Sequence, residues 1–317
     1  VLDLCGFSRF YLSGEGAAEW LRTQITGGLT KVGRMGLIYF ADSRGRIVTE
    51  MSVMRLAEDS FVLITAAAAQ WHDYELLWRN LPDHLSLSDR TTDFGTLVVS
   101  GPRARELFAK ISDADLSLGW LTLQEATVAG CPVRLARVSY AGELGWEIHS
   151  EVEHISALYQ AVLDAGAKPY GMIALNCLRM EKGYRSWKGD LTTDYTALEG
   201  GLDRFIKWDK PAFTGKEALQ AQREAGVTKK FTTFIVDVEE FDTPYMSTIW
   251  LGDEIVGETT SGGYGYAVDA AIAFGMLRAD CREAGTELEI EIYGQRYRAV
   301  VQKDEPLWDA ANDRLRA

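Results

Sequence analysis

The ten residues from Ser139 to Ile148 hold the groups that most clearly suggest chemistry. They read Ser139-Tyr-Ala-Gly-Glu-Leu-Gly-Trp-Glu-Ile148 and end a β-prone run. Two glycines there allow positive φ or a close approach to a ligand, and they predict a tight turn around Glu143 and Glu147. A carboxylate at Glu147, beside the flat face of Trp146, suits a heterocycle with adjacent N–H donors. An acidic β-turn with a core tryptophan fits the same residues.

Glu50 is a second candidate, because it is an acid on a mostly uncharged strand face. Alternation along the predicted strand 46–56 places Val48, Ser52 and Met54 on the same face as Glu50. Such a carboxylate tends to have a raised pKa, which a general acid or base needs near neutral pH. An edge-strand glutamate that points to water fits the pattern as well.

Arg179 lies in the middle of a predicted helix, 171–182. Its guanidinium could hold a carboxylate in bidentate fashion, although a surface ion pair is the commoner role for such a residue. The loop that follows is rich in aromatic residues, with Tyr184, Trp187 and Tyr195. This composition indicates either a ligand wall or core packing.

The elements that must position these residues change character along the chain. Strands and amphipathic helices mix in the first part, where the clearest helix is 154–165. Beyond residue 226 the pattern predicts only short strands, with two-residue hairpin turns at Gly252-Asp253 and Gly294-Gln295. We therefore predict an α+β protein with two interleaved subdomains in 1–226 and an antiparallel β-barrel in 227–317.

Composition excludes several classes of function. The net charge is −13 and no run of Lys or Arg occurs, which argues against nucleic acid or a membrane surface as partner. The four cysteines and four histidines show no zinc spacing, so we expect no metal and a reducing compartment, cytoplasmic or the mitochondrial matrix of a eukaryote. No GxGxxG follows a strand, and the glycine run 262–265 falls between predicted strands, not before a helix.

Five ordered motifs extend this interpretation. They are Tyr140-x-Gly-Glu-x-Gly-Trp-Glu147, Leu178-Arg-Met-Glu-Lys-Gly-Tyr184, Leu198-Glu-Gly-Gly-Leu202, Phe213-x-Gly-Lys-Glu-Ala-Leu219 after Lys207, and Thr260-Ser-Gly-Gly-Tyr264. Together they resemble the folate-binding glycine cleavage T-protein (aminomethyltransferase) family from end to end. Arg185-x-Trp187 and the tail Asn312-x-Arg-Leu-Arg316 resemble the C-terminal half of dimethylglycine and sarcosine dehydrogenases.

The resemblance implies three subdomains around a central channel that holds tetrahydrofolate. It implies that Tyr140 and Glu147 contact the pterin, with Trp146 beside them, and that Arg179 and Trp187 border the folate site. Glu50 stands where the family has an essential aspartate. In two further departures, Leu37 replaces a common tyrosine and Lys188 replaces a usual glycine.

The implied reaction is capture of the methylene unit of an oxidised N-methyl amine, giving 5,10-methylenetetrahydrofolate, with Glu50 as the base. The sequence contains no flavin motif, so we expect FAD only in a preceding or partner domain or subunit; a start at Val1 without Met favours a longer parent chain. A T-protein-like transferase with a lipoyl carrier, a folate-dependent O- or S-demethylase, and a non-catalytic folate-binding protein remain rival hypotheses.

Overall fold

A computed structural model describes residues 1–317, and the chain forms two compact units. Unit 1 comprises Val1–Tyr39, Glu50–Met172 and Asn312–Ala317. Unit 2 comprises Phe40–Thr49 and Ile173–Ala311. Unit 1 therefore contains both candidate carboxylates of the sequence analysis, Glu50 and Glu147, whereas Arg179 and Trp187 belong to unit 2.

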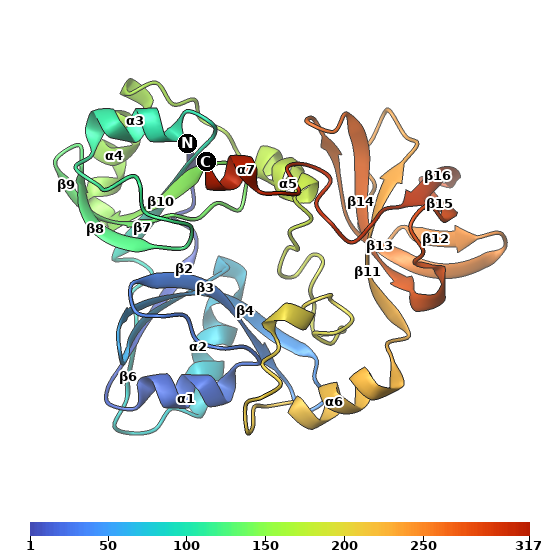
Figure 1. Ribbon diagram of the computed structural model, residues 1–317, viewed down its shortest axis with the longest axis horizontal. Coiled ribbons are helices and arrows are strands. Elements are labelled where there is room, and N and C mark those ends of the chain that lie inside the picture. The colour runs from blue at the N-terminus through green and yellow to red at the C-terminus, as the bar shows by residue number, and fades with distance from the viewer. The chain divides into compact units, whose positions relative to one another are not determined.

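The first sheet of unit 1 has the strand order β1-β7-β10-β9-β8. Its strands and its two helices are β1 Leu2–Asp3, β7 Phe94–Ser100, α3 Ala104–Ile111, β8 Leu123–Val128, β9 Cys131–Ala136, β10 Gly145–Glu151 and α4 Val152–Asp164. The long strand β10 pairs antiparallel with both β7 and β9, so it is central. Helices α3 and α4 cover one face of this sheet, as Figure 1 shows.

The second sheet has the order β3-β4-β5-β2-β6. Its elements are β2 Ser8–Ser13, α1 Ala17–Gln24, β3 Arg34–Ala41, β4 Ile47–Ala57, β5 Ser60–Thr65, α2 Gln70–Arg79 and β6 Ser86–Asp89. Helix α2 packs on it through Tyr74, whose ring lies 5.5 Å from that of Phe10 on β2. The apolar cluster of Met54, Val62 and Ala136 joins the two sheets, because its members come from β4, β5 and β9.

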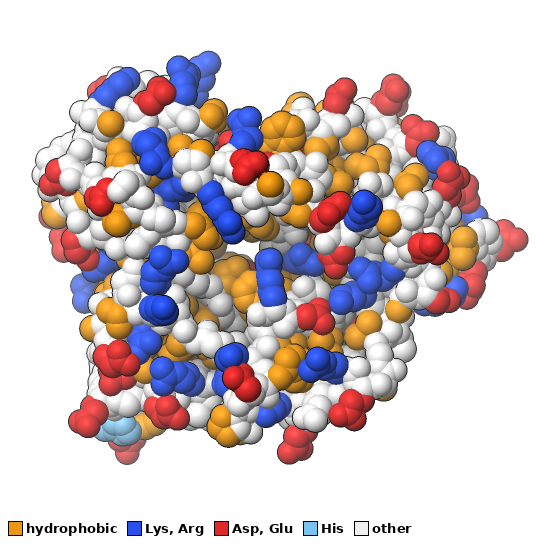
Figure 2. All heavy atoms as spheres, viewed as in Figure 1, with side chains coloured by type: hydrophobic (Ala, Val, Ile, Leu, Met, Phe, Trp, Pro, Cys, Tyr) orange, Lys and Arg blue, Asp and Glu red, His pale blue; other side chains and the backbone are white.

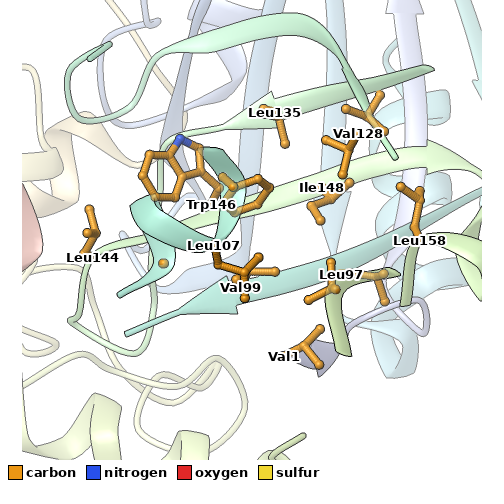
Figure 3. Packing of buried hydrophobic residues seen from close by; sticks show 14 residues of the cluster. Val1, Leu97, Val99, Leu107, Val128, Leu135, Leu144, Trp146, Ile148 and Leu158 are labelled. Atoms are coloured by element: carbon orange, nitrogen blue, oxygen red, sulfur yellow. The ribbon is translucent and has the colours of Figure 1, made fainter. Parts of the chain in front are cut away.

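Trp146 sits within the main core of unit 1, between the first sheet and its helices (Figure 3). The side chains alternate along β10, so Trp146 and Ile148 face this core while Glu147 and His149 face the opposite side. Phe108 of α3 packs edge-to-face on the indole, with ring centroids 5.2 Å apart. The apolar face of β10 therefore fixes the strand that positions Glu147.

Unit 2 contains a closed barrel with the strand order β11-β14-β13-β12-β15-β16. The elements of this unit are α5 Met172–Glu181, α6 Lys216–Ala225, β11 Lys229–Val236, β12 Thr248–Leu251, β13 Glu254–Gly265, β14 Ala270–Arg278, β15 Glu287–Ile292 and β16 Gln295–Val301. The last helix, α7 Asp313–Arg316, returns to unit 1. The α+β class and the antiparallel barrel are thus confirmed.

Several local predictions need correction. The glycines of 262–265 lie inside β13, not between strands, since β13 extends to Gly265. Glu147 lies in strand β10, not in the turn before it. The second barrel hairpin turns at Tyr293-Gly294, one residue earlier than predicted, because both residues take positive φ there. The predicted boundary near residue 226 falls between α6 and β11, and it stays a prediction.

Charged side chains of both signs are scattered over the face drawn in Figure 2, and neither sign covers it. No helix of the structure combines the length and the apolar character needed to cross a membrane.

We predict that Gly275→Ala destabilises the barrel. A β-carbon at Gly275 on the barrel strand β14 would lie 2.6 Å from the carbonyl oxygen of Glu258 on β13, so a strand must shift. Overpacking of this kind costs about 1–3 kcal/mol of unfolding free energy. Urea denaturation should show this loss, while the control Gly119→Ala, where nothing lies within 4 Å, should not. Equal stability of the two variants would contradict the packing described for β14.

Candidate functional site

Glu147 is held in place by a neighbour on its own strand. The Nε2 atom of His149 lies 3.0 Å from Oε2 of Glu147, and two-residue spacing puts both side chains on one face of β10. The Glu147 side chain is 16% exposed, whereas that of His149 is 8% exposed. The carboxylate makes no second hydrogen bond in the described chain, so it keeps acceptor capacity for a ligand.

The turn that carries Tyr140 is clamped by the C-terminal tail of unit 1. Arg314 on α7 donates from Nε to both carboxylate oxygens of Glu143, at 3.1 and 3.2 Å. Arg137 donates to the carbonyl oxygens of Leu315 and Ala317 at 3.2 and 3.1 Å. Tyr140 itself is 37% exposed in the loop just before β10. The tail therefore fixes the loop next to Glu147.

Trp146 does not offer its ring to a ligand. The side chain is 1% exposed, and the guanidinium of Arg137 lies 4.8 Å from the ring centroid within the same unit. Together with Phe108, these contacts give the indole the core role that the sequence left open. Alternation turns Trp146 away from Glu147, and its contact with a cofactor stays a prediction.

Glu50 is half-buried near the middle of β4. Burial raises the pKa of its carboxyl group from 4.5 to about 7, and a hydrogen bond with the side chain of Tyr39 opposes part of this rise. Tyr39 lies two residues after Leu37 on β3, on the same face. Tyr39 thus places a tyrosine hydroxyl on the same strand in which the family pattern has a tyrosine at position 37. The raised pKa inferred from the sequence is confirmed.

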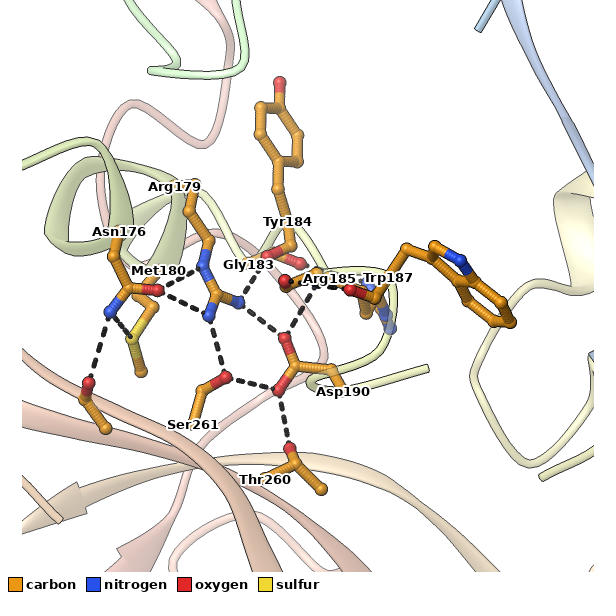
Figure 4. Close-up of polar contacts among 12 residues, drawn as sticks. Asn176, Arg179, Met180, Gly183, Tyr184, Arg185, Trp187, Asp190, Thr260 and Ser261 are labelled. Carbon is orange, nitrogen blue, oxygen red and sulfur yellow. Dashed lines mark hydrogen bonds and ion pairs between the residues drawn. The ribbon is translucent and has the colours of Figure 1, made fainter. Parts of the chain in front are cut away.

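Arg179 is saturated by protein partners in unit 2 (Figure 4). Its five N–H bonds go to Asn176 twice, at 3.0 and 2.7 Å, and once each to the carbonyl of Tyr184, Asp190 and Ser261. A guanidinium has five donors, so none is left for a ligand carboxylate. The side chain is buried, not at the surface. Arg179 therefore holds Asp190 in place, and its position at the border of the folate site stays a prediction.

Asp190 is the centre of this network. One carboxylate oxygen accepts from Arg179 at 2.6 Å and from the backbone N–H of Ser186 at 2.8 Å. The other accepts from the hydroxyls of Thr260 and Ser261 at 2.6 and 2.7 Å. These bonds tie the motif 178–184 to the motif 260–264 and fix the loop that contains Trp187.

Trp187 remains a candidate ligand contact. Its indole Nε1 is buried and has no hydrogen-bond partner, and buried donors normally find one in a protein or a ligand. The next residue, Lys188, has φ of 66°, in the left-handed region. This backbone conformation explains why glycine suits the position, since glycine reaches it without a steric cost.

Three important residues escaped the sequence analysis. His149 could have been found from its two-residue spacing to Glu147, and Tyr39 from the same spacing to Leu37. Nothing in the sequence pairs Asp190 with Arg179 across a loop. In unit 1 the structure thus provides a raised-pKa acid at Glu50 and an oriented carboxylate at Glu147.

Comparison with known proteins identifies relatives along the full chain. Residues 1–210 match the GCVT N-terminal domain, and residues 229–309 match the glycine cleavage T-protein C-terminal barrel domain. The mitochondrial dimethylglycine dehydrogenase of Rattus norvegicus is 32% identical over 97% of this chain, which spans 37% of that protein. An aminomethyltransferase of Listeria monocytogenes serotype 4a (strain HCC23) is 28% identical over 95% of this chain and 84% of its own length.

A solved structure shows the same fold. The crystal structure of the glycine cleavage system aminomethyltransferase T from Bartonella henselae has a TM-score of 0.89 and 23% sequence identity. The match covers 98% of this chain and 86% of that protein.

We predict that Glu50 makes stability depend on pH. The folded chain holds the Glu50 proton up to about pH 7, whereas an unfolded chain releases it near pH 4.5. The unfolding free energy of wild type relative to Glu50→Gln should therefore fall as pH rises between these values and level off above them. Chemical denaturation at several pH values measures this difference. The variant Glu151→Gln, which removes an exposed carboxylate of the same unit, provides the reference for a glutamate-to-glutamine change. A flat difference for Glu50→Gln would contradict the raised pKa.

We predict a large loss of stability for Asp190→Asn. The change leaves the buried Arg179 guanidinium without its counter-charge, which costs about 3–5 kcal/mol. The control Asp209→Asn removes an exposed ion pair with Lys207 and should cost less than about 1 kcal/mol. Thermal unfolding of both variants tests the expectation, and similar melting temperatures would refute it.

Proposed function

The chain belongs to the glycine cleavage T-protein family, and from that premise we propose that it transfers a one-carbon unit to tetrahydrofolate. One observation carries the proposal: the Glu147 carboxylate of unit 1 is bonded by His149 on one oxygen and keeps further acceptor capacity. A reduced pterin presents adjacent N–H donors along one edge, and an ionised carboxylate is the acceptor that binds such donors most strongly.

Trp187 stays a proposed folate contact on the basis of the family resemblance. Within unit 2 its buried Nε1–H has no hydrogen-bond partner in the protein. Tyr140 stays a proposed pterin contact on the basis of the family resemblance. Bound tetrahydrofolate would supply the nitrogen nucleophile that receives the one-carbon unit.

We assign Glu50 the role of general base. A nitrogen that bonds to carbon must lose a proton, and a base is most efficient when its pKa lies near the working pH. Burial raises the pKa of Glu50 to about 7, so the carboxylate is ionised to a useful extent near neutrality yet still binds a proton. The Tyr39 side chain orients this carboxylate through its hydrogen bond.

The one-carbon donor that we propose is the methylene iminium, or formaldehyde, made by oxidation of an N-methyl amine of the dimethylglycine or sarcosine type. Bonding of the donor carbon to two folate nitrogens, each of which loses its proton, gives 5,10-methylenetetrahydrofolate. From the iminium this step releases the demethylated amine and a proton, and from formaldehyde it releases water. The likeness to dimethylglycine dehydrogenase supports this donor. The oxidation itself is assigned to an FAD-dependent domain or partner subunit.

A second candidate is transfer from an aminomethylated carrier by a separate aminomethyltransferase. The match to this chain covers 84% of the Listeria monocytogenes enzyme. A stand-alone enzyme of about this size therefore occurs among the relatives, which favours the second candidate. Feeding each donor with labelled carbon and following its arrival on folate separates the two. Retention of all three methyl hydrogens would instead indicate an O- or S-demethylase.

The function is tested with two variants and one control. Tetrahydrofolate binding, measured by calorimetry without oxygen, should weaken about 10- to 100-fold in Glu147→Gln, as expected for a lost charge-assisted hydrogen bond. Glu151→Gln, an exposed carboxylate at the end of the same strand, should bind like wild type. Glu50→Gln should bind tetrahydrofolate but lose turnover. Failure of the wild-type chain to bind tetrahydrofolate would overturn the proposal.

A further inference from the structure

A chain of four polar side chains crosses unit 1 and ends at Glu147. The guanidinium of Arg9 on β2 donates from Nη2 to the hydroxyl of Thr96 on β7. That hydroxyl lies 2.8 Å from Nδ1 of His149, whose Nε2 lies 3.0 Å from Oε2 of Glu147. Arg9 is 2%, Thr96 3% and His149 8% exposed, so the links are shielded from water. We name this set of four residues the relay.

The chemistry of the four groups gives the relay a single direction. Arginine has donors only, so the Thr96 oxygen must accept from Arg9. At the other end, the Glu147 carboxylate only accepts, so Nε2 of His149 must carry a proton. In a neutral ring Nδ1 is then the acceptor, and it takes the hydroxyl proton of Thr96. A neutral imidazole with an accepting Nδ1 holds its proton on Nε2, which therefore donates to the Glu147 carboxylate. The two ends of the relay, the donor Arg9 and the acceptor Glu147, thus set its direction for a neutral ring.

Burial favours the neutral ring that this direction requires. Burial lowers the pKa of His149, while the hydrogen bond and the negative charge of Glu147 raise it. The cationic side chains of Arg9 and Arg134, from β2 and β9, also lower it. A neutral donor leaves the negative charge of Glu147 uncompensated by the ring, and that charge remains available to a ligand. An imidazolium in the same place would neutralise it.

Resting on the function proposed above, we infer that His149 is a positioning residue, which the relay locks as the Nε2–H tautomer to hold one oxygen of Glu147 and aim the other acceptor sites at the pterin. A carboxylate on a flexible side chain loses rotamer freedom when it binds a ligand. The relay fixes that rotamer beforehand, because Arg9 is itself anchored to the carbonyl oxygens of Phe7 and Phe94 at 2.8 and 3.0 Å.

The tautomer can be read directly, without folate. The ¹⁵N spectrum of histidine-labelled protein at pH 7, with the His149 signals assigned by their loss in His149→Gln, should show a neutral ring protonated on Nε2. Thr96→Val removes the hydroxyl while keeping the side-chain shape, so the His149 signals should move toward the other tautomer or the imidazolium. The control Ser150→Ala removes a hydroxyl on β10 that bonds to the carbonyl of Pro132 instead, and it should leave these signals in place.

Binding then connects the relay to the ligand. Tetrahydrofolate affinity should fall about 10-fold in Thr96→Val and in His149→Leu, as is typical when a group that orients a ligand-binding residue is lost. His149→Gln can still donate to Glu147, so it should bind more tightly than His149→Leu if both are folded. A merely structural role would not distinguish these two variants.

The outcomes separate the inference from the function on which it rests. A protonated His149 or the Nδ1–H tautomer in wild type would overturn the relay, and so would equal spectra and affinities in Thr96→Val and Ser150→Ala. A wild-type chain with the predicted tautomer but no affinity for tetrahydrofolate would overturn the proposed function, and with it the assignment of Glu147 to a pterin.

Discussion

Carboxylates withdrawn from water set the conditions that the rest of this structure must meet. A buried acid must be paired, hydrogen-bonded or protonated, because the charged form loses its hydration. The chain meets this requirement in three ways: Asp190 is paired with Arg179, Glu50 keeps its proton up to about pH 7, and Glu147 accepts a hydrogen bond from His149. Of these three residues, only Glu50 and Glu147 can still exchange a proton with a ligand or accept a hydrogen bond from it.

These differences assign separate roles to residues that look alike in the sequence. Both carboxylate oxygens of Asp190 accept hydrogen bonds from protein donors, so this residue has a structural role. Glu50 has the pKa expected of a base, and Glu147 has the partly satisfied carboxylate expected of a binding group. The apolar face of β10 supports these separate roles. Trp146 and Ile148 anchor the strand in the core, and the opposite face of the strand carries Glu147 and His149.

The fold was largely predictable from the sequence. Alternation and turn signals predicted the barrel strands, and three-to-four-residue periodicity predicted the helix seen as α4. Short strands such as β6 and β8 were missed, because a few mixed residues give little periodicity. Glu50 and Glu147 emerged because single acids in apolar strands stand out. The partner of Arg179 was missed, since Asp190 lies across a loop whose path no local pattern reveals.

The proposed function depends on the Glu147 carboxylate binding the edge of a reduced pterin. A crystal structure of the chain soaked with a stable reduced folate tests it most directly. We expect pterin N–H groups at hydrogen-bonding distance, about 2.7–3.2 Å, from Glu147, with His149 still bonded to the same carboxylate. A pterin bound elsewhere, with Glu147 turned toward solvent, would contradict it.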